Sequence, residues 1–290
     1  MEVDIPRLLF QHSIKEHLYR NGFKWIDRFC ISSKNTPYYI HEGETYVMTE
    51  WIDGRECDFY NLQDIKKAMS TLVEMHIRSN GMTPMEGSRI QYDKRDFSQI
   101  FQKRIREFNT IKRKINRQSH MSDFDILFLK HYRYYEALCF KSLEWIEEAH
   151  YHKILNKVQE EKSFYHNDYT YHNLFMIPDG SLYVTHFEES KYGIPLYDLV
   201  SLLKKVMKKQ EWNIQIAHQL LSIYNQKIDL QDQKNLLISL LIYPDDFLKV
   251  CNKYYNTRRI WASQGLLRKL NFIIDQKQDL QEFIKYVENL

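Results

Sequence analysis

The sequence predicts an α+β fold of two unequal lobes, a small one with a helix and short strands and a large one that is mainly helical. The 290 residues are enough to bury a core in each lobe. Alternating β-branched and aromatic residues predict strands within residues 24–51, whereas helical periodicity dominates residues 53–290 apart from a short hairpin at 173–187. The chain has only 8 glycines and 6 prolines, so few strained turns are expected, which suits a helical protein.

The small lobe is expected to begin with an amphipathic helix over residues 4–20 that ends at Asn21-Gly22. Three strands follow in the prediction, over residues 24–31, 36–41 and 44–51, and a turn at Glu42-Gly43 joins the last two. The segment WIDGRECDF at residues 51–59 then breaks the strand pattern with Asp53-Gly54. We therefore place the boundary between the lobes at residues 52 and 53.

The large lobe is predicted from helical spacing of its apolar residues. Asn61 and Asp64 resemble a capping box at the start of its first helix. A break is expected at Pro244, because proline lacks the N–H that a helix interior needs. The expected helices cover residues 61–76, 98–117, 123–149, 197–209, 213–226, 231–255 and 264–290.

Two polar features of these helices have a structural and a functional interpretation. The helix at 98–117 has an inward apolar face and a basic outer face, and the latter is interpreted as a solvated surface rather than a site for an anionic partner. His131, on the apolar stripe of the next helix, is interpreted as a core histidine rather than a ligand. The basic face comprises Lys103, Arg104, Arg106, Lys112, Arg113, Lys114 and Arg117.

Composition excludes several classes of function. Forty-one basic and 38 acidic residues give a net charge of only +3, so no global basic field points to nucleic acid. The four cysteines are widely scattered and form no metal-binding spacing, as in proteins of a reducing compartment. No apolar run of about 18 residues indicates a membrane helix, and the N-terminus does not resemble a secretory signal. We expect synthesis in the cytoplasm and no membrane partner.

The strongest functional signal is the polar loop YHNDYTYHNLF at residues 165–175. Asn173 follows Asp168 by five residues, and His166 precedes it by two. This is the spacing of a phosphoryl-transfer loop, in which Asp168 accepts the proton of a substrate hydroxyl and Asn173 offers an oxygen to magnesium. Residues 173–177 and 183–187 are expected to form a hairpin, with a turn at 178–180, that brings a second metal ligand back to the loop.

Together with HFEESKYGIPLYDL at residues 186–199, this loop resembles the aminoglycoside phosphotransferase and choline kinase superfamily, which pairs an HxDxxxxN loop with an acidic, G-x-P-x-x-D-L segment. Within it, WIDGRECDF, LKKVMKKQEW at 203–212 and LLIYPDDFLKVCNKYYN at 240–256 resemble the CotS-type spore coat proteins of endospore-forming bacteria. The resemblance spans the chain. It implies a protein kinase-like two-lobe fold with a truncated N-lobe, location in the spore coat, and spore coat proteins as partners.

The resemblance also marks a departure at the metal site. Where the superfamily has a magnesium-chelating Asp just before Phe187, this chain has His186. Magnesium prefers oxygen ligands in an octahedron, so a neutral imidazole predicts weak metal binding. Glu188 or Glu189 would need a local shift to substitute, since a residue two places along a strand is displaced by about 6.6 Å.

A second departure concerns the phosphate-binding parts of the nucleotide lobe. No two glycines stand in GxGxxG spacing, and no strand with an interior lysine precedes the first helix. The helix at 4–20 resembles the one that follows the lysine strand in the superfamily. The chain is therefore expected to begin inside the nucleotide lobe, either truly or because its start is misplaced.

Two hypotheses for function follow. In the first, the protein is a degenerate kinase fold kept as a structural or binding component of the coat, because each missing part removes electrostatic stabilisation that phosphoryl transfer needs. In the second, it is an active phosphotransferase that uses ATP and Mg to modify a small-molecule or protein hydroxyl. The residues implied are Asp168 as base, Asn173 and Glu188 as metal ligands, and the backbone of Glu50, Trp51 and Ile52 for the nucleotide.

The same residues also have purely structural interpretations. Asp168 and Asn173 could bond their own backbone, as Asx turns do. His166 and Asp198 could serve only as a packing link between the loop and the helix near residue 197, where a carboxylate favours the positive helix end. Tyr171 and His172 are also interpreted as structural. Trp51, Trp145, Trp212 and Trp261 are expected in the core or a groove, and an aromatic pocket for a cationic head group stays open.

Overall fold

The computed structural model describes residues 4–256 and 263–290. The chain divides into two compact units, which are described one at a time. The first unit holds residues up to 94, 152–210 and 215–230, and the second holds residues 95–151, 211–214 and 231–290. The expected lobe boundary at residues 52 and 53 lies inside the first unit and stays a prediction. Trp261 lies outside the described residues.

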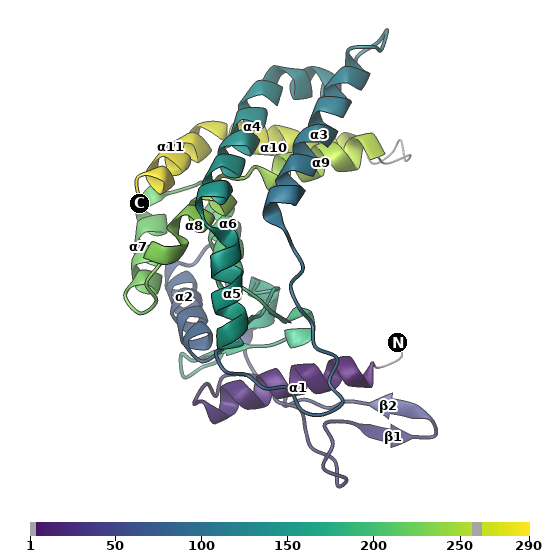
Figure 1. Cartoon of the computed structure of the whole chain (residues 1–290), viewed down its shortest axis with the longest axis vertical. Coiled ribbons are helices and arrows are strands. Elements are labelled where there is room, and N and C mark those ends of the chain that lie inside the picture. The colour runs from purple at the N-terminus through teal and green to yellow at the C-terminus, as the bar shows by residue number, and fades with distance from the viewer. Residues whose placement is uncertain (1–3, 257–262) are drawn as a thin grey trace. The chain divides into compact units, whose positions relative to one another are not determined.

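The first unit begins with α1, Ile5–Arg20, as expected (Figure 1). The side chain of Asp4 caps the helix by accepting from Arg7 N, and the chain turns away at Gly22 with φ +88°. Strands β1, Tyr39–His41, and β2, Glu44–Tyr46, pair antiparallel around Glu42-Gly43. Both turn residues have positive φ, which is the geometry of a tight hairpin turn.

The expected strand at residues 24–31 is wrong. This segment makes only isolated bridges, from Ile26 to Val184 and from Phe29 to Thr49. Its buried residues, Ile26 and Phe29, are three positions apart and not two, and its bonds lead to several different segments because no neighbouring strand runs along it. Residues 24–31 are therefore an irregular segment and not a strand of a sheet.

A small three-stranded sheet supports the predicted catalytic loop. Its order is β3, Arg55–Glu56, then β5, Leu174–Met176, then β6, Leu182–Val184, all antiparallel. The hairpin of β5 and β6 was expected, but β3 lies in the segment WIDGRECDF that was interpreted as a break. A separate two-stranded ribbon pairs β4, Phe164–Tyr165, with β7, Lys191–Tyr192.

The helices of this unit flank those strands. They are α2, Leu62–Ile77; α5, Tyr151–Glu161; α6, Leu196–Lys209; and α7, Ile214–Asn225. The capping box is half right: the Asn61 side chain accepts from the N–H of residues 63 and 64, but Asp64 does not reach back to Asn61. Its carboxylate is instead bound by Arg55 and by the backbone of Asp58. Helix α5 was not predicted.

The second unit is helical and is held together by aromatic stacking. Figure 1 shows α3, Phe97–Ile115, and α4, Asp123–Glu148, as neighbouring helices joined by a protruding loop. Helix α8, Lys234–Ile242, packs on α4. The ring of Tyr135 stacks on Phe247 at 3.7 Å, and Phe101 stacks on Tyr243 at 3.9 Å. The remaining helices are α9, Asp245–Asn256; α10, Ser263–Asp275; and α11, Lys277–Glu288.

Candidate phosphoryl-transfer site

The predicted catalytic loop is anchored by a buried carboxylate. Asp198 lies in the first turn of α6, is 1% exposed, and accepts hydrogen bonds from the backbone N–H of His166 at 2.6 Å and of Asn167 at 2.8 Å. Asn167 has φ +66°, so its backbone makes the left-handed turn that opens the loop. The contacts agree with the expected packing link between loop and helix, and the bonds of Asp198 define the loop conformation.

His166 connects the loop to the end of β6. Its ring is fully buried, Nδ1 accepts the N–H of Asp168 at 3.2 Å, and Nε2 donates to the carbonyl of Thr185 at 2.9 Å. Burial lowers the pKa of His166, and only the neutral ring with its proton on Nε2 makes both contacts. The neutral His166 ring therefore links the loop to the segment that carries His186 by hydrogen bonds at both nitrogens.

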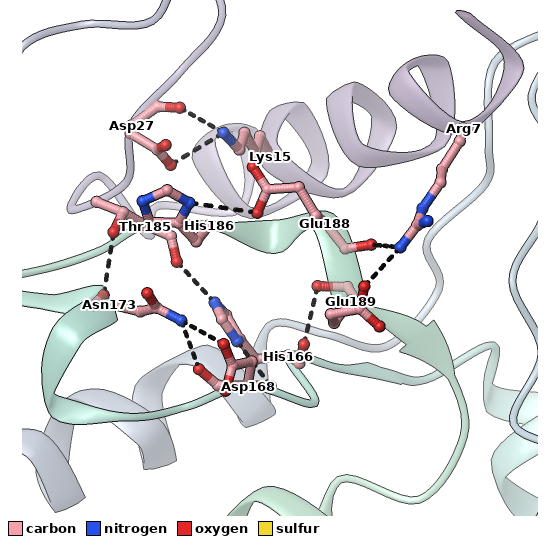
Figure 2. Close-up of polar contacts among 11 residues, drawn as sticks. Arg7, Lys15, Asp27, His166, Asp168, Asn173, Thr185, His186, Glu188 and Glu189 are labelled. Atoms are coloured by element: carbon pink, nitrogen blue, oxygen red, sulfur yellow. Dashed lines mark hydrogen bonds and ion pairs between the residues drawn. The ribbon is translucent and has the colours of Figure 1, made fainter. Parts of the chain in front are cut away.

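Asp168 and Asn173, the predicted base and metal ligand, are brought together. The Asn173 amide donates to Asp168 Oδ2 and to the Asp168 carbonyl, both at 2.8 Å (Figure 2). Within the described residues, Asn173 Oδ1 and Asp168 Oδ1 make no hydrogen bond. The two side chains bond each other rather than only their own backbone.

The segment after β6 turns more tightly than expected. His186 has φ +62°, and Phe187–Glu189 form a single 3₁₀ turn instead of continuing the strand. The Glu188 carboxylate thereby doubles back toward His186, with Oε2 at 3.5 Å from Nδ1. The expected strand displacement of Glu188 is wrong for this reason. In Figure 2 the carboxylate is directed toward His186 and Lys15, while the Asn173 amide is directed toward Asp168.

A buried lysine on α1 completes the site and was missed by the sequence reasoning. Lys15 is 1% exposed; its Nζ donates to the Asp27 carbonyl at 2.8 Å and lies 3.0 Å from Asp27 Oδ1. The ammonium sits over the rings of Phe29 and Phe187, with 4.1 Å and 5.7 Å to their centroids. Burial lowers the pKa of Lys15, while Asp27 and then Glu188 oppose that shift. A lysine between Leu8 and Leu18 on the apolar stripe was the available signal.

Arg7, also on α1, clamps the acidic segment. Its Nη2 donates to the Glu188 carbonyl and to Glu189 Oε1, each at 2.7 Å. Both side chains are partly exposed, so the ion pair itself contributes little to stability, and its role is to fix the position of the turn.

The predicted nucleotide-contacting segment is bonded to residues 24–31 and leads into strand β3. The N–H of Glu50 donates to the Arg28 carbonyl at 3.1 Å, and the side chain of Trp51 is 91% exposed. Just beyond it, Gly54 lies so close to β5 that an added Cβ would stand 2.8 Å from the Met176 carbonyl oxygen. The nucleotide role of Glu50, Trp51 and Ile52 stays a prediction.

The residues present do not fit a magnesium ion. The Asn173 oxygen is available, but the position before Phe187 offers an imidazole nitrogen, and the Glu188 carboxylate is directed to His186. Across the described parts of the chain, no three His, Cys, Asp or Glu side chains cluster as a metal centre would require. None of the helices in those parts is both long and apolar enough to span a bilayer.

Comparison with known proteins identifies the fold. Residues 3–287 match the family described as "Spore coat putative kinase YutH". Spore coat protein S of Bacillus subtilis (strain 168) is 23% identical over 253 residues, which cover 85% of this chain and 70% of that protein.

The solved structures agree. The aminoglycoside phosphotransferase of Alicyclobacillus acidocaldarius superposes with a TM-score of 0.87 at 19% identity, covering 100% of this chain and 86% of that chain. Spectinomycin phosphotransferase APH(9)-Ia, solved with ADP and spectinomycin, gives 0.60 at 14% identity, covering 97% and 83%. The expected kinase-like fold and the resemblance to spore coat proteins are confirmed.

Proposed function

Since the chain belongs to the family of the spore coat putative kinase YutH, we propose that it is a kinase-fold component of the spore coat that acts by binding other coat proteins and not by phosphoryl transfer. It would be made in the cytoplasm and then join the coat, as the name of its relative Spore coat protein S suggests. Neither nucleic acid nor a membrane has a part in this proposal.

One observation carries the proposal: of the four acidic side chains labelled around the loop in Figure 2, Asp27, Asp168 and Glu189 are paired with groups of the protein, and Glu188 lies beside His186. A phosphotransferase needs carboxylates that are free to hold its metal ions. Here a nucleotide with its metal would first have to displace the internal partners. The pairs are Asp27 with Lys15 at 3.0 Å, Asp168 with Asn173 at 2.8 Å and Glu189 with Arg7 at 2.7 Å. Glu188 Oε2 lies 3.5 Å from His186 Nδ1, a contact that is an ion pair only when the imidazole is protonated.

The buried ammonium of Lys15 adds an electrostatic reason. The Lys15 ammonium lies beside the Phe187 ring, and Glu188 is close enough to affect the pKa of Lys15. Its positive charge repels a divalent cation near Glu188. The same cation stabilises the acidic turn without any bound ion. In this account the loop geometry is retained by Asp198, His166 and Lys15 because the fold needs it.

Spore coat assembly tests the proposal with one loop variant. Asp168→Asn keeps the shape and the partner Asn173 but removes the carboxylate that a base requires. It should enter the coat in normal amount when produced in a sporulating host that lacks its own copy. Asp198→Asn is the matched control, because it disturbs the buried anchor and should lower folded protein and incorporation together. Failure of a stably folded Asp168→Asn variant to assemble would contradict the proposal.

An active phosphotransferase is the second candidate function, and one feature of the loop favours it. The Asp168 carboxylate is half-buried and has one oxygen that accepts no bond from the described residues, as a base awaiting a hydroxyl would have. This candidate assigns ATP to the backbone of Glu50, Trp51 and Ile52, and Mg to Asn173 and Glu188. Its substrate would be a small-molecule or protein hydroxyl, and nucleotide titration separates it from the first.

A further inference from the structure

A cavity of about 690 Å³ lies within the first unit and shares no lining residue with the site described above. A volume of this size suits a small-molecule ligand. One wall is the segment 84–94, the other wall is α5, and the floor is formed by Tyr192 and Gly193 at the end of β7. Nothing in the phosphoryl-transfer reasoning uses this space.

The α5 wall is one face of a helix. Leu155, Val158 and Gln159 line the cavity, and their spacing of three and four residues places them on a single stripe. Lys162, the residue after the last helical one, also lines the cavity. Two apolar side chains thus lie beside an amide and an ammonium. The wall is apolar along its length and cationic at its C-terminal end.

Lys162 holds its position at a conformational cost. The N–H of Ser163 donates to the Val158 carbonyl and that of Lys162 to the Gln159 carbonyl, which is the Schellman pattern that ends many helices. The residue at this position usually is glycine, because its φ is positive, and here Lys162 has φ +50°. Strained positions of this kind gather at binding sites.

The opposite wall is fixed in place, so the cavity is preformed. The N–H of Asp93 donates to the Tyr192 carbonyl and that of Tyr192 to the Gln91 carbonyl, both at 2.8 Å. The Tyr92 ring stacks on Tyr192 with 5.7 Å between centroids. At the floor, a Cβ on Gly193 would stand 2.9 Å from the Asp93 side chain, so the segment and β7 approach as closely as backbone permits.

The charges that face the cavity favour an anion. Lys94 and Lys162 are exposed, and the side-chain ammonium of neither has an ion-pair or hydrogen-bond partner among the described residues. The lining has one acidic residue, Asp93, whose Oδ2 accepts from the Tyr165 hydroxyl at 2.8 Å, so the two lysines outnumber the carboxylate by one charge. Pro84, Ile90 and the rings of Tyr92 and Tyr192 supply apolar and aromatic lining to the same cavity.

From these observations we propose that the cavity binds a small amphipathic carboxylate with an aromatic body, the ring lying against Tyr92, Tyr192 and Leu155 and the carboxylate meeting Lys94 and Lys162. The site is separate from the predicted catalytic residues. It contacts the loop through the bond from Tyr165 to Asp93, because Tyr165 directly precedes His166.

The test uses 3-phenylpropionate and its amine counterpart 3-phenylpropylamine as probes of the folded full chain, with ligand-observed NMR to obtain affinities. The carboxylate should bind and the amine should bind roughly tenfold more weakly or not at all. Lys94→Gln and Lys162→Gln should each weaken the carboxylate roughly two- to fivefold, the range of a partly exposed charge contact. Lys153→Gln removes the same charge from the opposite face of α5 and should change nothing.

Two further variants separate binding from folding. Leu155→Trp fills the cavity from a half-buried position and should abolish carboxylate binding without lowering the melting temperature substantially. Lys162→Gly relieves the positive φ and should raise the melting temperature while it weakens the carboxylate. Absence of binding by the folded wild-type chain, equal affinity for amine and carboxylate, or unchanged binding by Leu155→Trp would each overturn the proposal.

Discussion

Loss of the Asp27 carboxylate tests whether Lys15 is an internal counter-ion of the site. The two side chains are 13% and 2% exposed, so solvent screens their interaction little. Asp27→Asn leaves the ammonium with the Asp27 carbonyl and the Phe29 ring, and removing one partner of a buried pair costs about 3 kcal/mol, the lower end of the usual range. Lys15→Met leaves the slightly more exposed carboxylate unpaired and should cost about 2 kcal/mol.

The double variant Lys15→Met/Asp27→Asn contains neither charge and should cost only about 2 kcal/mol, so that the cycle yields a coupling of about 3 kcal/mol. Urea unfolding followed by circular dichroism measures each free energy, with tryptophan fluorescence as the check on two-state behaviour. Lys249→Met, at an exposed pair with Asp245, is the control and should cost less than about 0.5 kcal/mol. Additive effects of the two site variants would refute the coupling.

Three further predictions concern the loop and its surroundings. Because burial lowers the pKa of His166, the unfolded chain binds a proton below about pH 6.5 that the folded chain does not. The free energy of unfolding should therefore fall as pH falls below that value, by up to about 1.4 kcal/mol per pH unit for this residue. In urea unfolding at pH 5 to 7, His166→Gln should show a shallower dependence of this free energy on pH. Asp198→Ala leaves the buried backbone N–H of His166 and the part-buried N–H of Asn167 without their acceptor and should cost about 3 kcal/mol, measured by the same denaturation. A loss under about 1 kcal/mol would show that the anchor is dispensable. Gly193→Ala forces a Cβ to 2.8 Å from the Tyr165 ring and should cost about 1 to 3 kcal/mol in thermal unfolding, whereas Gly265→Ala, in a helix with open space around it, should stabilise by about 0.5 kcal/mol.

The long helices could be predicted because their apolar spacing is sustained over several turns. Helices α1, α3, α4 and α6 begin and end within two residues of the expected positions, and the break at Pro244 separates α8 from α9. The break between α10 and α11 at Gln276 was missed, since no proline or glycine marks it and apolar residues continue on both sides. Helix α5 was missed because it is short and has only two buried residues, Ile154 and Val158.

The short strands could not be predicted reliably from local sequence. Strand β3 has two residues, both exposed, and exists because its backbone pairs with β5, which is more than a hundred residues away. Residues 24–31 have the composition of a strand but no continuous partner. In both cases a distant pairing partner determines whether a strand forms, and the sequence of the segment alone does not reveal that partner.

The candidate site also has features that the sequence could predict and features that it could not. The spacing of His166, Asp168 and Asn173 correctly predicted that these residues share one loop, because they are close in sequence. The buried role of Lys15 depends on Asp27 and Phe187, which lie in other segments. The position of Glu188 depends on a 3₁₀ turn that begins at a left-handed His186. Long-range contacts of this kind appear only once the chain is folded.

The most direct test of the central claim is nucleotide binding by the purified full chain. Isothermal titration with ATP, in the presence of Mg or Mn and again with a chelator, measures whether the paired site accepts a metal nucleotide. An active aminoglycoside phosphotransferase serves as the positive control. If the paired site excludes a metal nucleotide, no binding is expected up to millimolar ATP in either condition. Metal-dependent binding in the micromolar range, about 8 kcal/mol, would contradict it and favour the phosphotransferase.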